Sequence, residues 1–67
     1  MTAYGLTPRE VAVLSLLAEG LGDKQIARRL GLAPTTVPVF TRHIYSKMGS
    51  HTRTGAAVRA VREGIIR

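Results

Sequence analysis

The segment that decides the fold runs from residue 23 to residue 49 and reads DKQIARRLGLAPTTVPVFTRHIYSKMG. Its first eight residues carry apolar side chains at the spacing of one helix face, and Gly31 follows as a natural helix end. After a short connection, Phe40, Ile44 and Met48 recur at intervals of four residues, which predicts a second, longer helix. A short helix, a tight glycine turn and a longer helix together predict a helix-turn-helix.

Two prolines lie at the entrance of this longer helix. If the helix began with Ala33 as its cap, Pro38 would be the fifth helical residue, and an interior proline costs about 3 kcal/mol. With Thr35 as the cap, Pro38 falls in the first turn, where amide hydrogens have no intrahelical partner. We therefore predict that regular helix starts near residue 35 or 36, that residues 32–34 are extended, and that the following proline distorts Val37.

Two further helices flank this segment. The sequence TPRE at residues 7–10 reads as a capping box, with Thr7 as the cap, Pro8 at the first helical position and Glu10 three residues after the cap. The chain is therefore expected to be all-α, a compact four-helix domain over residues 6–67, preceded by a flexible tail at residues 1–5. The predicted helices span about 8–19, 23–30, 35–48 and 53–63.

Length and composition restrict the classes of protein. Sixty-seven residues form one small domain. The chain has no cysteine, which fits a reducing compartment, and it has neither a signal-peptide pattern nor an apolar run of about 18 residues. A cytoplasmic location without membrane insertion is expected.

Charge is the main compositional signal. Ten lysines and arginines face four acids, for a formal net charge of +6. Eight of the basic residues lie between Lys24 and Arg62, and no acid lies in that interval. Such a segment predicts a surface that binds a polyanion, with a merely solvated basic face as the alternative.

The sequence offers little for catalysis. The central acid-free interval excludes a pair of carboxylates, and neither a Ser/His/Asp set, a Cys/His set nor a phosphate-binding loop is present. His43 and His51 have no partner at metal-ligand spacing. We therefore expect no enzyme activity, no cofactor and no metal site.

Several motifs at matching spacing resemble one family. LTPRE at 6–10, LLAEGLGDKQIARRLGLAPTTV at 16–37, RHIYSKMG at 42–49 and RTGAAVRAVREGII at 53–66 are similar to the LuxR-type (FixJ/NarL) DNA-binding domain of bacterial transcription regulators. The sigma-factor helix-turn-helix is similar over the first half only. The resemblance implies a sequence-specific double-stranded DNA binder that forms the effector part of a longer regulator, usually after a sensory or receiver domain. RNA polymerase is a further possible partner.

The resemblance also suggests which residues contact DNA, with the helix at 35–48 in the major groove. The predicted base readers and helix-start contacts are Thr35, Thr36, Val39, Arg42, His43 and Ser46. The predicted phosphate contacts are Lys24, Lys47 and Arg53, with Arg28 and Arg29 as further candidates. Within this set, Val39 could touch a thymine methyl group and Arg42 could reach a guanine or a phosphate.

The last helix and the departures from the family pattern raise alternatives. The resemblance implies that two domains bind DNA as a homodimer through the last helix. Val58, Val61 and Ile65 have the spacing for that interface, although they could equally belong to the core of the domain. Pro38 stands where the family often has a lysine or arginine, and Phe40 where it commonly has histidine. These exchanges support a second hypothesis, in which the fold is kept as a protein-interaction module with weakened or lost base reading.

Overall fold

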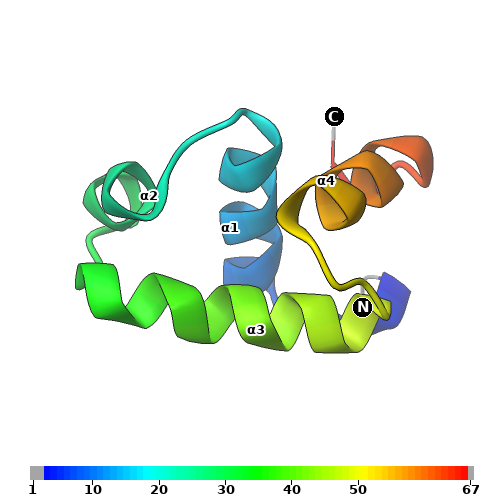
Figure 1. The fold of residues 1–67 in the computed structure, drawn as a ribbon, viewed down its shortest axis with the longest axis horizontal. Helices are drawn as coiled ribbons and strands as arrows, with labels where there is room; N and C mark the ends of the chain where they lie inside the picture. The colour runs from blue at the N-terminus through cyan, green and yellow to red at the C-terminus, as the bar shows by residue number, and fades with distance from the viewer. Residues whose placement is uncertain (1–2, 67) are drawn as a thin grey trace.

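The computed structural model describes residues 3–66, and within them it contains helices and no strand. The α-helices are α1 (Pro8–Ala18), α2 (Asp23–Leu30), α3 (Val37–Met48) and α4 (Arg53–Arg62), and the two short 3-10 helices are η1 (Ala3–Gly5) and η2 (Pro34–Thr36) (Figure 1). The prediction of an all-α, four-helix domain is confirmed, with each α-helix boundary within two residues of its predicted place. None of the helices in residues 3–66 is long and apolar enough to cross a membrane.

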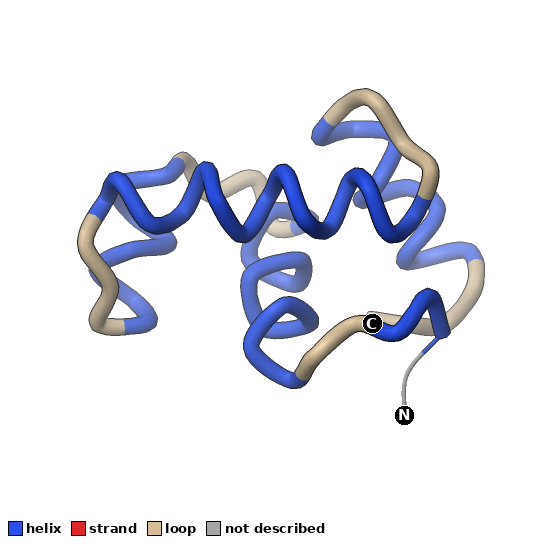
Figure 2. The backbone as a smooth tube through the Cα atoms, turned by 90° about the horizontal axis from the view of Figure 1, so that it is seen from below, coloured by secondary structure: helices blue, strands red, loops and turns tan. Residues whose placement is uncertain are grey.

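The longest helix, α3, lies along one side of the molecule (Figures 1 and 2). Helix α1 packs against both α3 and α4, while α2 packs against η2 and the α3 helix. The core between them is apolar, and its largest fully buried side chains are Val13, Leu14, Ile26, Val37, Ile44 and Met48. Helix α4 contributes small side chains, since Ala56 and Ala60 are also fully buried. These residues hold α3 against the rest of the domain.

The ends of the helices follow local rules. The predicted capping box of α1 is present: the Glu10 amide donates to Thr7 Oγ1 at 3.1 Å, and the Thr7 amide donates to Glu10 Oε1 at 2.8 Å. Gly22 is the N-cap of α2, and its amide donates to the Gln25 side chain at 2.9 Å. Gly31 ends α2 in the left-handed region, at φ 68°, which a residue with a Cβ rarely adopts.

The start of α3 differs from the prediction. Pro34 is not extended but opens the 3-10 helix η2, with Ala33 as its extended cap, and regular α-helix begins only at Val37. Thr35 is therefore not the cap. The Val37 amide donates to the Pro34 carbonyl, which is the carbonyl that the missing amide of Pro38 would have served. Val37 keeps helical angles, φ −59° and ψ −45°, so the predicted distortion there is wrong.

The predicted N-terminal tail is partly ordered. Residues 3–5 form η1, and the Tyr4 hydroxyl donates a hydrogen bond of 2.7 Å to Glu63 Oε1, beyond the end of α4. The Gly5 carbonyl accepts a hydrogen bond of 3.1 Å from Lys47 Nζ on α3. Residues 1 and 2 of the predicted tail, and Arg67, lie outside the described residues.

We expect Pro38→Ala to lower the free energy of unfolding by no more than about 1 kcal/mol, because Pro38 sits in the first turn and restricts the unfolded chain. His43→Pro is the matched control, since it places proline at an exposed position inside α3 and should cost about 3 kcal/mol. Urea unfolding measures both. A gain of several kcal/mol in Pro38→Ala would contradict a strain-free start of α3.

Candidate nucleic-acid interface

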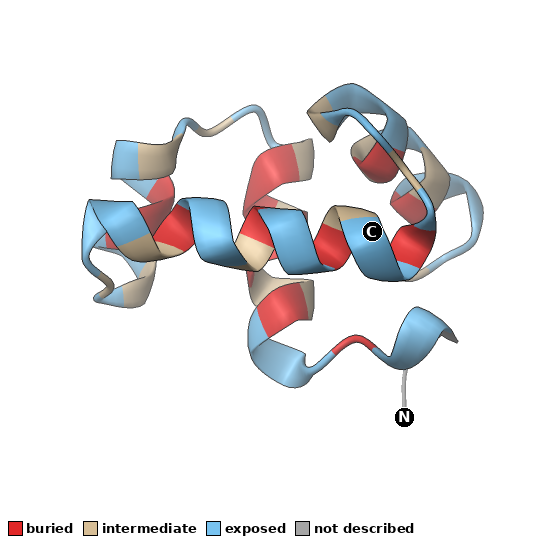
Figure 3. Ribbon diagram, turned by 60° about the horizontal axis from the view of Figure 1, so that its bottom comes forward, coloured by how far each residue is buried: buried red, intermediate tan, exposed pale blue. Residues whose placement is uncertain are grey.

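Helix α3 has one buried face and one exposed face (Figure 3). Val37, Thr41, Ile44 and Met48 are buried and recur every three or four residues. On the opposite side, Pro38, Val39, Arg42, His43 and Ser46 are all exposed. At 3.6 residues per turn, these five positions share one contiguous side of the helix. An exposed helix face of this length can enter a DNA major groove.

Most of the predicted base readers lie on this exposed face. Thr35 precedes it in η2 and is exposed, whereas Thr36 is half-buried. Val39 keeps 41% of its surface exposed, so its methyl groups can reach a ligand at this face. Arg42 makes no hydrogen bond or ion pair within residues 3–66, so its guanidinium is available for a ligand. Thr41, which the sequence did not single out, is buried, and its hydroxyl donates to the Pro38 carbonyl at 3.0 Å.

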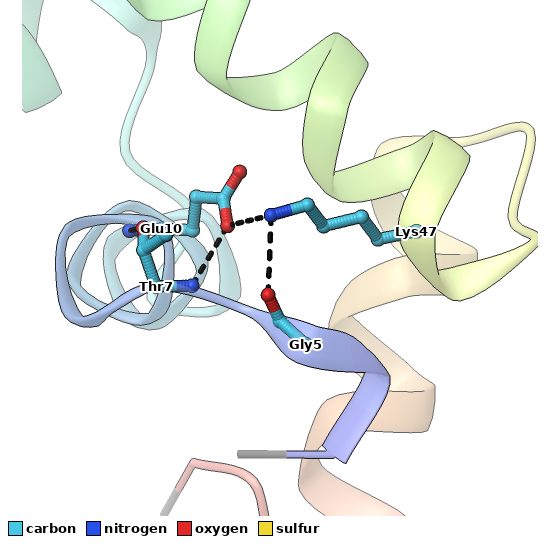
Figure 4. A network of polar contacts seen from close by, with 4 residues as sticks. All are labelled: Gly5, Thr7, Glu10 and Lys47. Atoms are coloured by element: carbon cyan, nitrogen blue, oxygen red, sulfur yellow. Dashed lines mark hydrogen bonds and ion pairs between the residues drawn. The ribbon is translucent and has the colours of Figure 1, made fainter. Parts of the chain in front are cut away.

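Lys47, a predicted phosphate contact, is engaged inside the domain (Figure 4). Its Nζ lies 2.7 Å from Glu10 Oε1, and it also donates to the Gly5 carbonyl. Glu10 is only 4% exposed. Burial on its own raises the pKa of the Glu10 carboxyl, but the Lys47 ammonium and the Thr7 amide stabilise the carboxylate more, so the pKa lies below its ordinary value of 4.5.

Arg53, another predicted phosphate contact, also has partners inside the domain. Its Nη1 donates to the Leu21 carbonyl at 2.9 Å, and its Nη2 lies 2.7 Å from Asp23 Oδ1. These bonds tie the first residue of α4 to the loop before α2 and to the first residue of α2. Arg59 likewise donates to the Met48 carbonyl and approaches Glu63 at 4.0 Å. Contact of Lys47 and Arg53 with phosphates stays a prediction, while their internal contacts give both a structural role.

Helix α2 carries three cations whose side chains have no partner within the described residues. Lys24, Arg28 and Arg29 are exposed, and none of them makes a hydrogen bond or ion pair within the described part of the chain. Arg28 and Arg29 line a shallow surface hollow together with Leu21 and Gln25. This charge lies beside η2 and the N-terminal end of α3, because α2 packs against both.

The backbone at the start of α3 offers few free donors. The Thr36 amide donates to the Ala33 carbonyl at 2.9 Å, the Val37 amide is used by the Pro34 carbonyl, and Pro38 has no amide hydrogen. Positions 36 to 38 therefore offer no free amide that could hold a phosphate.

The outer face of α4 is apolar in part. Val58 and Val61 are 45% and 53% exposed, and with Ala18, Ala57 and Arg62 they line a shallow hollow between α1 and α4. Ile65 differs from them, because it is half-buried and packs against the core. Of the predicted dimer residues, the structure leaves Val58 and Val61 open to a partner.

A helix-turn-helix whose second helix presents an exposed face is typical of DNA-binding regulator domains. The family model described as "Bacterial regulatory proteins, luxR family" matches residues 4–60. The chain therefore belongs to this family, and the prediction of a LuxR-type DNA-binding domain of a transcription regulator is confirmed. The match favours that prediction over the hypothesis of a protein-interaction module.

The chain is similar to parts of larger bacterial regulators. It is 49% identical over 53 residues to the nitrate/nitrite response regulator protein NarL of Escherichia coli (strain K12), covering 79% of this chain and 24% of NarL. It is 48% identical over 54 residues to the DNA-binding transcriptional activator DevR/DosR of Mycobacterium tuberculosis, covering 81% of this chain and 25% of that protein. The response regulator ChrA of a heme-sensing two-component system has the same fold, with a TM-score of 0.87 and 37% identity over 92% of this chain and 31% of ChrA. The chain thus spans about a quarter to a third of these relatives.

We expect Glu10→Gln to flatten the loss of stability in acid. The folded protein holds the Glu10 carboxyl at a lowered pKa, so its contribution is fully present above about pH 4.5 and is lost as the pH falls through the folded value. Glutamine keeps the acceptor for Lys47 and Thr7 but cannot be protonated in this range. Urea unfolding between pH 3 and 7 measures the effect, with the exposed Glu19→Gln as the control. An unchanged pH profile in Glu10→Gln would show that other carboxyls dominate.

Proposed function

We propose that this domain reads double-stranded DNA by placing α3 in the major groove while α2 holds the sugar-phosphate backbone. The observation that carries the proposal is the exposed side of α3, where Arg42 stands with no internal partner. Arginine reaches guanine O6 and N7 from this groove. His43, the next residue, and Ser46, about one turn on, add polar groups.

The phosphate grip comes mainly from α2. Lys24, Arg28 and Arg29 are exposed and unpaired within residues 3–66, whereas Lys47 and Arg53 have carboxylate partners of their own. Contacts of this kind are independent of sequence and weaken as salt rises. They hold the domain on the duplex so that α3 can read the bases.

Two copies of the domain pair through α4 on adjacent half-sites. Val58 and Val61 form the exposed apolar surface for this contact, and Ile65 supports it from the core. The exposed apolar surface is small, which suits a pair that forms on DNA rather than a permanent dimer. Both valines are exposed on α4, which favours a role in pairing over a role in the core of the domain.

The domain acts as the effector part of a longer transcription regulator. NarL and ChrA are response regulators by name, and this chain covers only a part of each. A sensory or receiver domain therefore controls access to DNA, and RNA polymerase is a further partner of the bound regulator. Because bacterial DNA lies in the cytoplasm, the proposed function implies a cytoplasmic protein.

Arg42→Ala should weaken binding to a preferred half-site by about 1–3 kcal/mol and relax the base preference at one position, because it removes a base contact. Fluorescence anisotropy on a duplex selected from a random pool measures the affinity. Arg62→Ala is the control, since it removes the same charge from an exposed position on α4. A uniform loss over all sequences would make Arg42 a phosphate contact, and no binding to any duplex at low salt would overturn the proposed function.

Val58→Asp with Val61→Asp should abolish cooperative binding to a duplex with two half-sites, because two charges would be buried against their copies. Binding to a single half-site should stay within about twofold, since neither valine belongs to the core. Comparing the two duplexes in the same titration separates pairing from folding. Unchanged cooperativity would place the pairing surface elsewhere.

A further inference from the structure

The exposed side of α3 is divided into two chemically different halves. Its first part presents Pro38 and Val39, and the exposed Thr35 lies one turn before them. This part carries no charge and no amide side chain. Its second part presents Arg42, His43 and Ser46. A DNA base approached by the first part can thus be recognised by apolar contact, or by the hydroxyl groups of the exposed Thr35 and the half-buried Thr36.

The backbone gives the first part no polar function either. Pro38 has no amide hydrogen, and its carbonyl accepts the hydroxyl of the buried Thr41 at 3.0 Å. The neighbouring amides of Thr36 and Val37 already donate within η2. The backbone at Pro38 and Val39 is anchored to the core on either side, because Val37 and Thr41 are buried.

The major groove offers one apolar feature that distinguishes base pairs, the methyl group at C5 of thymine. Cytosine lacks this group, and 5-methylcytosine carries it at the same atom. An apolar surface at this depth would therefore gain affinity from a C5 methyl group, whichever pyrimidine carries it. Burial of one methyl-sized group corresponds to about a fourfold change in affinity.

We propose that Pro38 and Val39 make binding depend on pyrimidine C5 methyl groups, so that the domain responds to thymine and also to cytosine methylation at the same position. The proposal rests on the proposed function, since it assumes that α3 lies in the major groove. In this proposal Pro38 contributes to sequence specificity by apolar contact, and its effect is more than the loss of a charged side chain.

The spacing within α3 places the methyl-dependent position relative to the position that Arg42 reads. Val39 and Arg42 are three residues apart, which is about 4.5 Å along the helix axis. Successive bases on a strand are about 3.4 Å apart. If α3 lies along the groove, the pyrimidine whose methyl group matters is one or two base pairs from the base that Arg42 contacts. That base is the position at which Arg42→Ala relaxes the sequence preference.

The test uses the preferred half-site and two substitutions that change only the methyl group. Each thymine in turn is replaced by uracil, and cytosine is compared with 5-methylcytosine at any thymine position where uracil weakens binding. We expect about a fourfold loss for uracil at one or two neighbouring positions, and a similar gain for 5-methylcytosine over cytosine. Both comparisons are made by anisotropy at one salt concentration, because the phosphate contribution is then constant.

Variants assign the effect to the two residues. Val39→Ala and Pro38→Ala should bring the thymine-to-uracil affinity ratio toward one. Arg42→Ala should lower the affinity for both duplexes and leave that ratio unchanged. Selective binding with a ratio of one at every thymine would overturn this inference and leave the proposed function standing. Failure to bind any duplex at low salt would overturn both.

Discussion

The rotation of α3 about its own axis is the constraint on which the rest of the surface depends. Val37, Ile44 and Met48 are almost completely buried, so this side of the helix must face α1 and the core. Each residue turns the helix by about 100°, and a shift of one position would carry Arg42 toward the interior. The apolar spacing that packs α3 against the core therefore also determines which side chains of α3 face a ligand.

Pairing with acids divides the basic residues into two groups. Glu10, Asp23 and Glu63 engage Lys47, Arg53 and Arg59. The first two pairs join different helices, whereas the Arg59–Glu63 pair lies at the C-terminal end of α4. The cations on α2, with Arg42 on α3, have no such partner within the described residues. The net charge of +6 therefore does not show where positive charge can attract a ligand. Lys47, Arg53 and Arg59 are largely neutralised by their acidic partners, whereas the cations on α2 are not.

Local pattern was enough for the helices, for the Thr7 capping box and for the exposed side of α3, because each depends on residues a few positions apart. Long-range contacts could not be read in this way. Lys47 lies 37 positions from Glu10 and Arg53 lies 30 positions from Asp23, and nothing in the neighbouring sequence marks either pair. The 3-10 turn at Pro34 was missed for another reason. In α-helical bonding Pro38 conflicts with the carbonyl of Pro34, whereas the 3-10 turn gives that carbonyl to the Val37 amide.

Pro38 at the start of α3 affects both the stability of the fold and the chemistry of the exposed helix face. The 3-10 turn gives the Pro34 carbonyl to the Val37 amide, so the fold loses no hydrogen bond to Pro38. Fixing φ at Pro38 also removes freedom from the unfolded chain, which favours the ordered helix start. What is given up is a cation in the groove. On the proposed function, affinity depends more on α2, whose phosphate contacts are independent of sequence, while discrimination by the first turns of α3 depends on shape and apolar contact. Such a surface gains little from a long-range electrostatic field, so its selectivity depends less on salt than the grip of α2 does.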